Sequence, residues 1–251
     1  MTLDTRQLFS VKSDEYAASR PQYPRELFDY LISVCPTRNR AWDCGTGSGQ
    51  AAVALAEWFA EVEATDVSPQ QIANARPHAH VRYSVQPAER TAFADGHFNL
   101  VTVAQALHWF DFSRFWPEVH RVLQPGGVFA AWTYTLPHLT TELDRIVDAK
   151  LLNLIKAYWA PQNRLAWDAY ANVPFPFHEL DVPQFDMRLS WTLEQFVAYL
   201  KTWSATRLCI DANGPEFFAE FVTELEGAWG ERTTVREVSM DFLCRIGRHE
   251  H

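Results

Sequence analysis

The sequence predicts an α/β fold: a doubly wound, Rossmann-like, mostly parallel seven-stranded sheet with an antiparallel C-terminal edge strand and helical cap insertions. Three observations support this prediction. Apolar strands and helices alternate with short loops between residues 40 and 133, which is typical of a parallel sheet covered by helices. The first strand runs into a glycine-rich turn followed by a helix. Two segments in the C-terminal third alternate apolar and polar residues, as strands beside a core do.

In the first half of the chain, strands and helices follow one another in a regular order. The segment 98–104 is apolar enough to indicate a central strand buried on both faces of the sheet. Ser68 precedes a proline at the first helical position and a capping-box glutamine, so a helix is expected to begin there. The expected elements are strands at 40–44, 61–66, 81–85, 98–104 and 128–132, and helices at 50–59, from 68 onward, and at 114–123.

The last third of the chain mixes helices with strands. Apolar residues between 143 and 158 trace one face of a helix. Residues 160–184 contain four prolines and are expected to form a loop. The alternating segments predict the two antiparallel strands. These strands are expected at 185–191 and 238–246, with further helices at 192–203 and 216–229.

Composition and charge exclude several classes of protein. The 251 residues include 22 Lys and Arg against 31 Asp and Glu, a net charge of −9 without a basic block, which argues against binding to nucleic acid. No apolar run approaches the roughly 20 residues that span a bilayer, and the N-terminus lacks a signal-peptide pattern. The four cysteines have neither metal spacing nor a paired arrangement. We therefore expect a cytoplasmic protein with no metal, nucleic-acid or membrane partner; its oligomeric state stays open.

The glycine-rich turn is the strongest functional signal. Gly45, Gly47 and Gly49 occupy alternate positions after the first strand, in a chain with only 10 glycines. Residues without side chains let a ligand lie against the backbone where a strand meets a helix. Asp66 ends the second strand, 19 residues beyond Gly47, where a carboxylate can accept both hydroxyls of a ribose. This arrangement predicts a cofactor that contains a nucleoside.

The spacing of the glycines argues against a dinucleotide. The dinucleotide motif is G-x-G-x-x-G, whereas this chain has G-x-G-x-G and places Gln50 where the third glycine would stand. Asp43, two residues before the turn, would repel a pyrophosphate and would suit a ligand that carries an ammonium group. An NAD-dependent oxidoreductase is therefore retained only as an alternative.

Five motifs between residues 40 and 133 carry a family resemblance. They are Trp42-Asp43-Cys44-Gly45-Thr46-Gly47-Ser48-Gly49, Ala64-Thr65-Asp66-Val67-Ser68-Pro69, Val85-Gln86-Pro87-Ala88-Glu89, Phe98-Asn99-Leu100-Val101 and Arg121-Val122-Leu123-Gln124-Pro125-Gly126-Gly127. In this order they resemble the motifs of the class I S-adenosylmethionine-dependent methyltransferases. Two residues depart from the usual pattern: Asn99 replaces an aspartate, and Gln86 replaces a residue that often contacts adenine.

Three shorter segments resemble one branch of that family. They are Tyr16-Ala17-Ala18-Ser19-Arg20-Pro21-Gln22-Tyr23-Pro24, Ala104-Gln105-Ala106-Leu107-His108-Trp109-Phe110-Asp111 and Thr202-Trp203-Ser204. The branch is that of the methyltransferase type 11, or trans-aconitate methyltransferase-like, enzymes that act on small molecules. No repeat or flexible linker interrupts the chain, so we expect one methyltransferase domain over 1–251. It would comprise an N-terminal cap (1–38), a cofactor-binding core (39–135), and helical insertions plus the last two strands (136–251).

The resemblance implies S-adenosylmethionine as cofactor and methyl transfer to a small-molecule acceptor, with a carboxylate among the candidates. Arg20 would pair with the methionyl carboxylate of the cofactor, and Tyr16 would close over it. Gln105 would stand near the methyl group, although a residue in its place can also cap a helix. The cofactor-binding residues expected are Tyr16, Arg20, Asp43, Gly45, Thr46, Gly47, Asp66, Val67, Ala88, Glu89 and Gln105.

Candidates for the acceptor side are fewer. His108 is the only histidine near the end of the fourth strand and is the candidate general base; the alternative is a packing role beside aromatic residues. Trp109 would form a wall of the pocket. Trp203 and Arg207, one helical turn apart, would line the acceptor side, with Arg207 meeting an anionic acceptor. A protein that binds the cofactor without transferring a methyl group is the second hypothesis.

Overall fold

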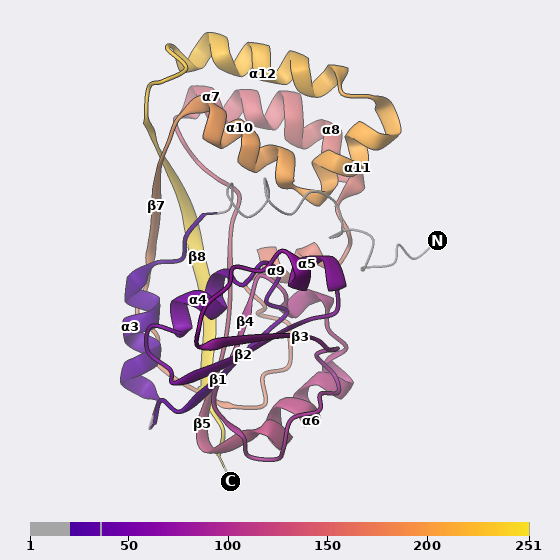
Figure 1. Cartoon of the computed structure of the whole chain (residues 1–251). Helices are drawn as coiled ribbons and strands as arrows, with labels where there is room; N and C mark the ends of the chain where they lie inside the picture. Colours follow the sequence, from indigo (N-terminus) through magenta and orange to yellow (C-terminus); the bar gives the residue numbers. More distant parts are fainter. Residues whose placement is uncertain (1–20, 36, 251) are drawn as a thin grey trace.

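The computed structural model describes residues 21–35 and 37–250, which form one eight-stranded sheet flanked by helices (Figure 1). The strand order is β3-β2-β1-β4-β5-β8-β6, and β7 pairs with β8 beside this path. The strands are β1 (Arg40–Cys44), β2 (Glu61–Asp66), β3 (Val81–Val85), β4 (Phe98–Ala104), β5 (Leu123–Tyr134), β6 (His178–Glu179), β7 (Asp186–Trp191) and β8 (Arg236–Arg248).

The first five strands confirm the predicted doubly wound, parallel half of the sheet. The chain starts at β1 in the middle of the sheet, winds outward through β2 to β3, and then returns to the other side of β1 with β4 and β5. The strand order therefore reverses between β1 and β4. In open parallel sheets, ligands bind at the carboxyl ends of the strands beside such a reversal.

The antiparallel part of the sheet contains three strands, because β8 is 13 residues long. Its C-terminal part, Phe242–Arg248, pairs antiparallel with β5, and its N-terminal part, Arg236–Asp241, pairs with β7. The two strands predicted near the end of the chain are thus confirmed. The sheet has eight strands instead of the predicted seven, because the two-residue β6 pairs with β8 within the segment expected to be a loop. The C-terminal strand β8 is antiparallel as predicted, but it lies between β5 and the short strands β6 and β7 and not at the edge.

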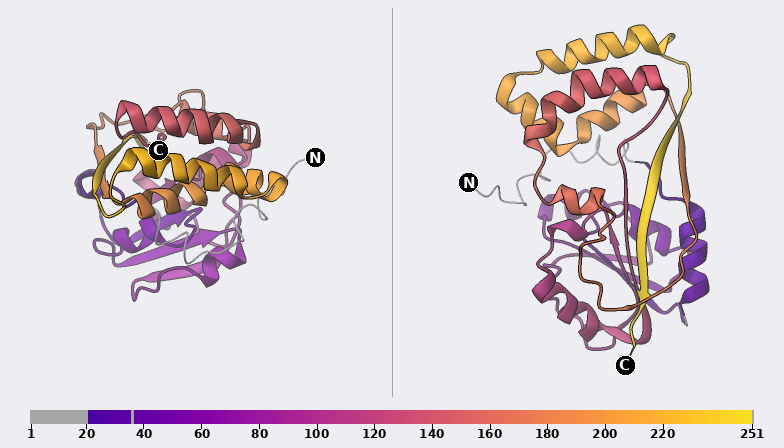
Figure 2. Two further views of the ribbon diagram at one scale, coloured as in Figure 1. Left: turned by 90° about the horizontal axis from the view of Figure 1, so that it is seen from above. Right: turned by 180° about the vertical axis from the view of Figure 1, so that it is seen from behind.

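Helices cover both faces of the parallel strands and form a separate layer at one end. In Figures 1 and 2 the helices α7, α8, α10, α11 and α12 stack above the carboxyl ends of the parallel strands, and β7 and β8 run up to them. The α-helices are α3 (Arg25–Val34), α4 (Gln50–Leu55), α5 (Pro69–Ala73), α6 (Phe112–Val122), α7 (Thr141–Val147), α8 (Asn153–Ile155), α9 (Asn163–Trp167), α10 (Leu193–Thr202), α11 (Ser204–Asn213) and α12 (Glu216–Trp229).

Two buried apolar clusters lie on opposite faces of the sheet. One packs α3 and α4 against the sheet and continues into the helical layer, whereas the other packs α6 and the segment around Tyr170 against the opposite face. The side chains of β4 from Phe98 to Val103 are buried throughout, as expected for a strand that contacts both clusters. This packing fixes the loops at the carboxyl end of β4 against the rest of the sheet.

The helix predictions hold for most of the chain, with differences at the ends. Thr192 and Gln195 form the predicted capping box at α10, and α12 has the predicted bounds. The helical face between 143 and 158 is confirmed, but a π-helical stretch, Asp148–Leu152, separates α7 from α8. The helix expected at 50–59 ends at Leu55 and continues as a turn. The helix α3 lies in the region that the sequence predicted only as a cap.

Two further features concern the part of the chain that the structure describes. None of its helices combines the length and the apolar character needed to cross a membrane. Its His, Cys, Asp and Glu side chains form no group of three or more that could hold a metal ion.

Candidate functional site

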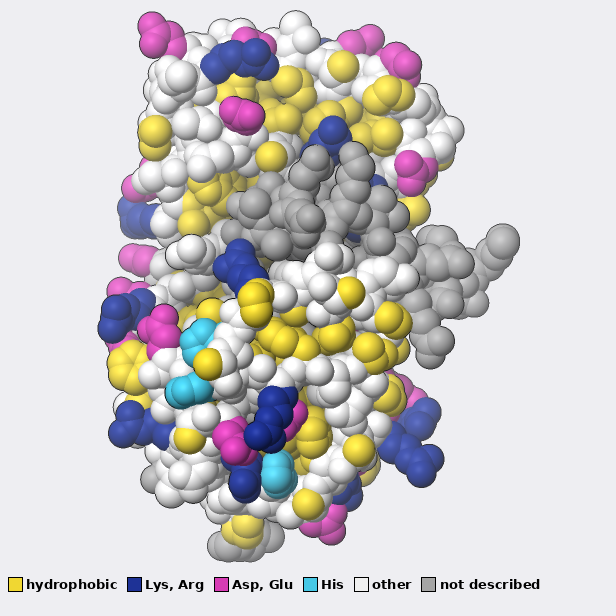
Figure 3. All heavy atoms as spheres, in the orientation of Figure 1, with side chains coloured by type: hydrophobic (Ala, Val, Ile, Leu, Met, Phe, Trp, Pro, Cys, Tyr) yellow, Lys and Arg dark blue, Asp and Glu magenta, His cyan; other side chains and the backbone are white. Residues whose placement is uncertain are grey.

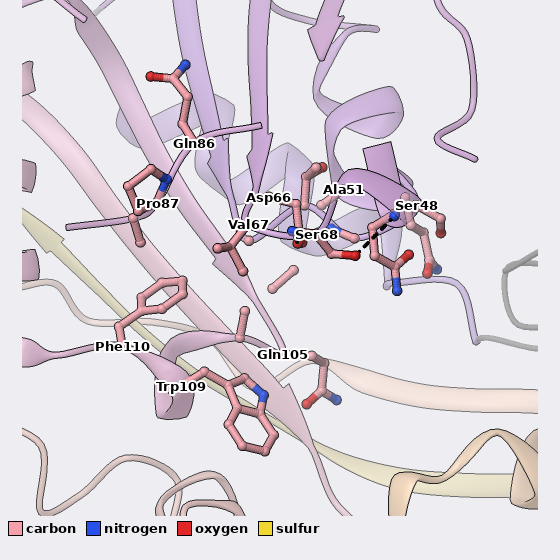
Figure 4. Close-up of a pocket in the computed structure, with 18 of the residues that line it drawn as sticks. Ser48, Ala51, Asp66, Val67, Ser68, Gln86, Pro87, Gln105, Trp109 and Phe110 are labelled. Carbon is pink, nitrogen blue, oxygen red and sulfur yellow. Dashed lines mark hydrogen bonds between the residues drawn. The ribbon is translucent and has the colours of Figure 1, made fainter. Parts of the chain in front are cut away.

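A pocket of about 580 Å³ lies at the carboxyl ends of the parallel strands, beside the reversal of strand order (Figure 4). Such a volume lies within the range of ligand sites for small molecules and cofactors, roughly 300–1,000 Å³. The residues that line it come from the loops after β1, β2, β3 and β4, from the end of β5 and from the segment before α3. They are Tyr23, Gly45, Thr46, Gly47, Ser48, Gln50, Ala51, Asp66, Val67, Ser68, Gln71, Gln86, Pro87, Ala88, Glu89, Ala104, Gln105, Ala106, Trp109, Phe110 and Tyr134.

The three glycines of the turn have different roles, although all have positive φ angles. A Cβ on Gly45 would lie 2.8 Å from the Cβ of Ala106, and a Cβ on Gly49 would collide with the Tyr83 hydroxyl. These two glycines therefore allow close packing of the loop against its neighbours, an alternative that the sequence left open for Gly49. A Cβ on Gly47 would meet no atom within 4 Å. Since Gly47 lines the pocket, this open space is where a ligand can lie against the backbone.

Asp66 stands where the sequence placed it, at the end of β2 and in the pocket lining. Its carboxylate accepts hydrogen bonds from the backbone N–H of Gly47 (2.9 Å) and of Ser68 (2.8 Å). Burial raises the pKa of Asp66, and these N–H donors oppose the rise. The two bonds hold the carboxylate beside the open space at Gly47, so it can accept hydroxyl groups of a bound nucleoside.

Asp43 does not line the pocket, in contrast to the expected direct contact with the cofactor. Its side chain is fully buried behind the glycine turn and accepts hydrogen bonds from the hydroxyls of Thr46 (2.6 Å) and Thr102 (2.9 Å). Burial raises the pKa of Asp43 to about 6. The carboxylate therefore joins the turn to β4, and its role in this geometry is to hold the glycine turn in place.

The loop after β3 forms another wall of the pocket. Ala88 and Glu89 line it as predicted. Gln86, the departure from the family pattern, also lines the pocket, and its side chain shapes the loop: its Oε1 accepts from the N–H of Ala92 (2.8 Å) and its amide donates to the Ser84 hydroxyl (2.8 Å). These two bonds hold the Gln86 side chain against its own loop.

Gln105 lies at the end of β4 and faces the pocket close to Trp109 (Figure 4). Its φ angle is +56°, in the left-handed region that side chains other than glycine rarely adopt. Its backbone N–H donates to the Trp132 carbonyl (2.9 Å), and its side-chain Oε1 accepts from the Thr133 hydroxyl (2.8 Å). These two contacts on β5 support the predicted position of Gln105 in the site.

His108 does not reach the pocket, so the geometry does not support the predicted general base. The side chain is 7% exposed and packs beside Trp109, with Nδ1 at 3.2 Å from the Tyr170 hydroxyl. Burial lowers its pKa to about 4, which keeps the ring neutral at neutral pH. The structure favours the alternative that the sequence left open, a packing position for this histidine.

The remaining predicted residues divide into three groups. Thr46, Val67 and Trp109 line the pocket as expected. Trp203 is buried in the helical layer, where it packs against Trp159 and Tyr199. Arg207 lies on α11 of the same layer, and neither of these two residues belongs to the described pocket lining. Tyr16 and Arg20 lie outside the described residues.

Several lining residues escaped the sequence analysis, chief among them Tyr23, Phe110 and Tyr134. Phe110 packs beside Gly45, and Tyr134 ends β5. Tyr23 had a detectable signal, since it belongs to a segment that resembles the N-terminal motif of the family branch. Gln50, which stands in place of the third dinucleotide glycine, donates a hydrogen bond to the Pro21 carbonyl. It therefore ties the segment before α3 to the rim of the pocket.

The sheet order and the pocket at its reversal point define a Rossmann-like protein that binds a nucleoside-containing cofactor. The methyltransferase domain family model matches residues 42–131. A Dictyostelium discoideum protein named as a methyltransferase is 32% identical over 225 residues, which cover 88% of this chain and 86% of that protein. These findings place the chain in the class I S-adenosylmethionine-dependent methyltransferases, whose cofactor is S-adenosylmethionine.

Two further comparisons agree with this assignment. A solved structure from Anaeromyxobacter dehalogenans, described as a type II methyltransferase, matches with 41% sequence identity and a TM-score of 0.84, over 92% of this chain and 98% of that one. A Mycobacterium bovis protein named as an uncharacterised methyltransferase is 36% identical over 113 residues, which cover 45% of this chain and 46% of that protein.

The residues present fit S-adenosylmethionine. The open space at Gly47 would receive the part of the cofactor next to the backbone, and Asp66 would accept the ribose hydroxyls. The loop Gln86–Glu89 would flank the adenine. When bound, the cofactor supplies a methyl group that is activated as a sulfonium. The aromatic side chains of Trp109, Phe110 and Tyr134 line the same pocket, and aromatic faces attract cations such as a sulfonium.

Proposed function

We propose that this enzyme transfers the methyl group to a small-molecule acceptor that needs no deprotonation by the protein, and that the acceptor is a carboxylate. The observation that carries this proposal is the set of titratable side chains among the described lining residues: Tyr23, Asp66, Glu89 and Tyr134. Neither a histidine nor a lysine belongs to this set. A carboxylate reaches the enzyme as its anion at neutral pH, so it needs no general base.

The positions of the two acidic lining residues also support an acceptor of this kind. Asp66 is held by two backbone N–H groups on the ribose side of the pocket. Glu89 accepts a hydrogen bond from the N–H of Asp111 (3.1 Å) and belongs to the loop that begins with Gln86 and Pro87. In Figure 4 that loop lies at the opposite end of the pocket from Gln105. Both carboxylates thus already accept hydrogen bonds from backbone N–H groups of the loops that surround the pocket.

The protein's part in such a reaction is mainly positioning. An oxygen lone pair of the acceptor forms a bond to the methyl carbon as the carbon–sulfur bond breaks. The electron pair of the carbon–sulfur bond stays on sulfur. This displacement requires the acceptor oxygen, the methyl carbon and sulfur to be aligned. The aromatic walls formed by Trp109, Tyr23 and Tyr134 would restrict the orientation of a small acceptor and exclude water from it.

Charge and size favour a small acceptor over a nucleic acid. The chain carries a net charge of −9, and Figure 3 shows basic side chains interspersed with acidic ones on the face that it displays. A nucleic-acid site would need a continuous basic surface.

The helical layer above the pocket is joined to the core by the pairing of β8 with β5, and we propose that both belong to one domain with the acceptor between them.

The test is an acceptor screen that detects release of S-adenosylhomocysteine. The panel should contain small mono- and dicarboxylates, each paired with its amide and its alcohol, together with phenols and amines. We expect turnover of a carboxylate but not of its matched amide, an alkali-labile methyl ester as product, and a kcat/KM that is flat between pH 7 and 9. A preference for an amine or a phenol, with a rate that rises with pH, would contradict the proposal.

A further inference from the structure

The loop that would flank the adenine is tied to the helix α6 by a buried carboxylate. Residues 86–97 connect β3 to β4 without a helix or strand of their own, and Gln86, Pro87, Ala88 and Glu89 line the pocket. A connection of this length without regular structure opens easily unless other parts of the protein hold it. The contacts that hold this loop therefore affect the shape of the pocket wall.

The carboxylate is that of Glu118, which lies within α6 and is 8% exposed. Its Oε1 accepts hydrogen bonds from both the backbone N–H (2.7 Å) and the hydroxyl (2.6 Å) of Thr91. The Arg121 guanidinium donates to Oε1 (2.7 Å) and to Oε2 (3.0 Å) of the same carboxylate. The buried charge is thus surrounded by donors, as a carboxylate shielded from water requires. One side chain joins the backbone of the loop to the helix.

The same helix holds the loop on either side of Thr91. Before Thr91, the carboxylate of Glu89 accepts a hydrogen bond from the N–H of Asp111 (3.1 Å), the N-cap residue of α6. After Thr91, the carbonyl of Phe93 accepts a hydrogen bond from the Arg121 guanidinium (2.7 Å). The loop therefore contacts α6 at three points, and Glu118 is at the middle one.

The burial of a charge at Glu118 calls for a reason other than stability. A buried ion pair is often no more stabilising than apolar side chains of similar size, because removing the charges from water is costly. A carboxylate provides what an apolar side chain cannot, namely short and directional hydrogen bonds to the Thr91 N–H and hydroxyl. The next N–H in the chain, that of Ala92, donates to the Oε1 of Gln86 (2.8 Å). Fixing Thr91 therefore also restrains the residues that line the pocket.

We propose that Glu118 is a positioning residue of the cofactor site, which acts through Thr91 to hold the loop in the conformation that selects adenine. Gln86 and Pro87 lie at one end of the pocket (Figure 4), whereas Glu118 does not belong to the described pocket lining. A loop held in one conformation presents its backbone donors and acceptors to a base in one pattern, so a base with a different pattern binds less tightly. This inference concerns the cofactor and does not depend on the identity of the acceptor.

The test compares two ligands that differ only in the base. S-adenosylhomocysteine carries adenine, whose exocyclic amino group donates and whose N1 accepts. S-inosylhomocysteine carries hypoxanthine, in which an oxo group accepts and N1–H donates. By calorimetric titration, we expect the wild type to bind the adenine ligand at least about 30-fold more tightly. Glu118→Ala should reduce this ratio about tenfold, the size of one lost hydrogen bond to a charged group.

The ratio of the two affinities separates positioning from a general loss of structure, because lower stability alone would weaken both ligands equally. Glu118→Gln keeps an acceptor oxygen for Thr91, so its ratio should stay within about threefold of the wild type. Thr91→Val keeps the carboxylate and the N–H but loses the hydroxyl, and it should lower the ratio about threefold.

The matched control is Asp144→Ala. It also removes a carboxylate that accepts a backbone N–H, that of Leu139 (2.8 Å), but Asp144 lies outside the described pocket lining, so the ratio should not change. If Glu118→Ala does not fold, Thr91→Val gives the decisive value. Equal affinities for the two ligands in the wild type, an unchanged ratio in Glu118→Ala and Thr91→Val, or an equal shift in Asp144→Ala would each overturn the proposal. None of these measurements involves methyl transfer, so they are independent of the proposed acceptor.

Discussion

The two ends of the pocket are built from different kinds of groups. At the glycine-turn end, the backbone of Gly47 and the carboxylate of Asp66 lie next to each other because β1 and β2 are neighbouring strands. At the other end, the side chains of Gln105 and Trp109 come from the segment between β4 and α6, and that of Tyr134 comes from the end of β5. The glycine-turn end depends on backbone conformation and one anion, whereas the far end depends on side chains that other elements hold in place.

This difference indicates how the two ends tolerate change. A substitution at the glycine-turn end alters the backbone surface that every bound cofactor must contact. A substitution at the far end removes one side chain among several, so its effect should be smaller and more selective for one part of a ligand. The following predictions test this contrast.

The largest effect is expected for Gly47→Val. A branched side chain at φ +55° is strained, and it would occupy the open space beside the backbone. We expect affinity for S-adenosylhomocysteine to fall at least ~100-fold, measured by calorimetric titration. The matched control is Gly126→Val, which has φ +76° and open space but lies outside the pocket lining. It should lower stability and leave affinity unchanged; similar affinity losses in both variants would remove the distinction.

The second prediction concerns stability and pH. Because burial raises the pKa of Asp43 from 3.8 to about 6, the folded state binds this proton more tightly than the unfolded state. Stability from this residue is therefore present at low pH and declines as pH rises from about 4 to 6, by up to about 1.4 kcal/mol per pH unit and about 3 kcal/mol in all. The free energy of unfolding of the wild type minus that of Asp43→Asn should fall across this window. A pH-independent difference would contradict the burial of an ionisable Asp43.

An intermediate effect is expected for Asp66→Asn. The amide keeps the shape of the side chain but turns one of two acceptor oxygens into a donor that faces a backbone N–H. We expect affinity for both S-adenosylhomocysteine and adenosine to fall by about ten- to thirtyfold, since both carry the ribose. Loss for only one of these ligands would show that Asp66 does not contact the ribose.

The smallest effect is expected for Trp109→Ala at the far end of the pocket. Removing one aromatic wall should raise the KM for the acceptor about tenfold and change affinity for S-adenosylhomocysteine by less than about threefold. Steady-state kinetics and titration check this pair of values. The control Trp167→Ala removes a tryptophan that is 43% exposed and lies outside the pocket lining. A Trp109→Ala variant with the larger defect in cofactor binding would place Trp109 against the cofactor instead.

The parallel half of the fold was predictable because its signals are local. The strand bounds, the glycine turn and the cap at Ser68 each occupy a few consecutive residues, and the structure confirms the turn, the cap and the bounds of β1 to β4. The strand β5, predicted at 128–132 after a turn, is longer and includes that turn (Leu123–Tyr134). The antiparallel strands were also visible from their two-residue period. The helix α9 and the strand β6 were not, because a segment with four prolines has no periodic pattern, and its short elements form through contacts with the sheet.

Residue roles were less predictable than residue positions. The sequence put Gln105 at the end of a strand, and the structure places it in the pocket. The same reasoning put Asp43 and His108 beside the ligand, but both are buried behind the pocket surface. A sequence motif shows that a residue lies near a site, whereas the direction of its side chain depends on which strands and helices enclose it.

The sequence by itself predicted the fold class, because the alternation of strands and helices and the glycine turn are properties of short segments. The resemblance of its motifs to those of a known family predicted the family and the cofactor. The tertiary structure alone decided which of three glycines faces the open space, that Asp43 joins the turn to β4, and that Thr133 on β5 donates to Gln105. The two hydrogen bonds among these contacts join residues that are 28 and 59 positions apart. They exist only once burial has excluded water and forced buried polar groups to satisfy one another.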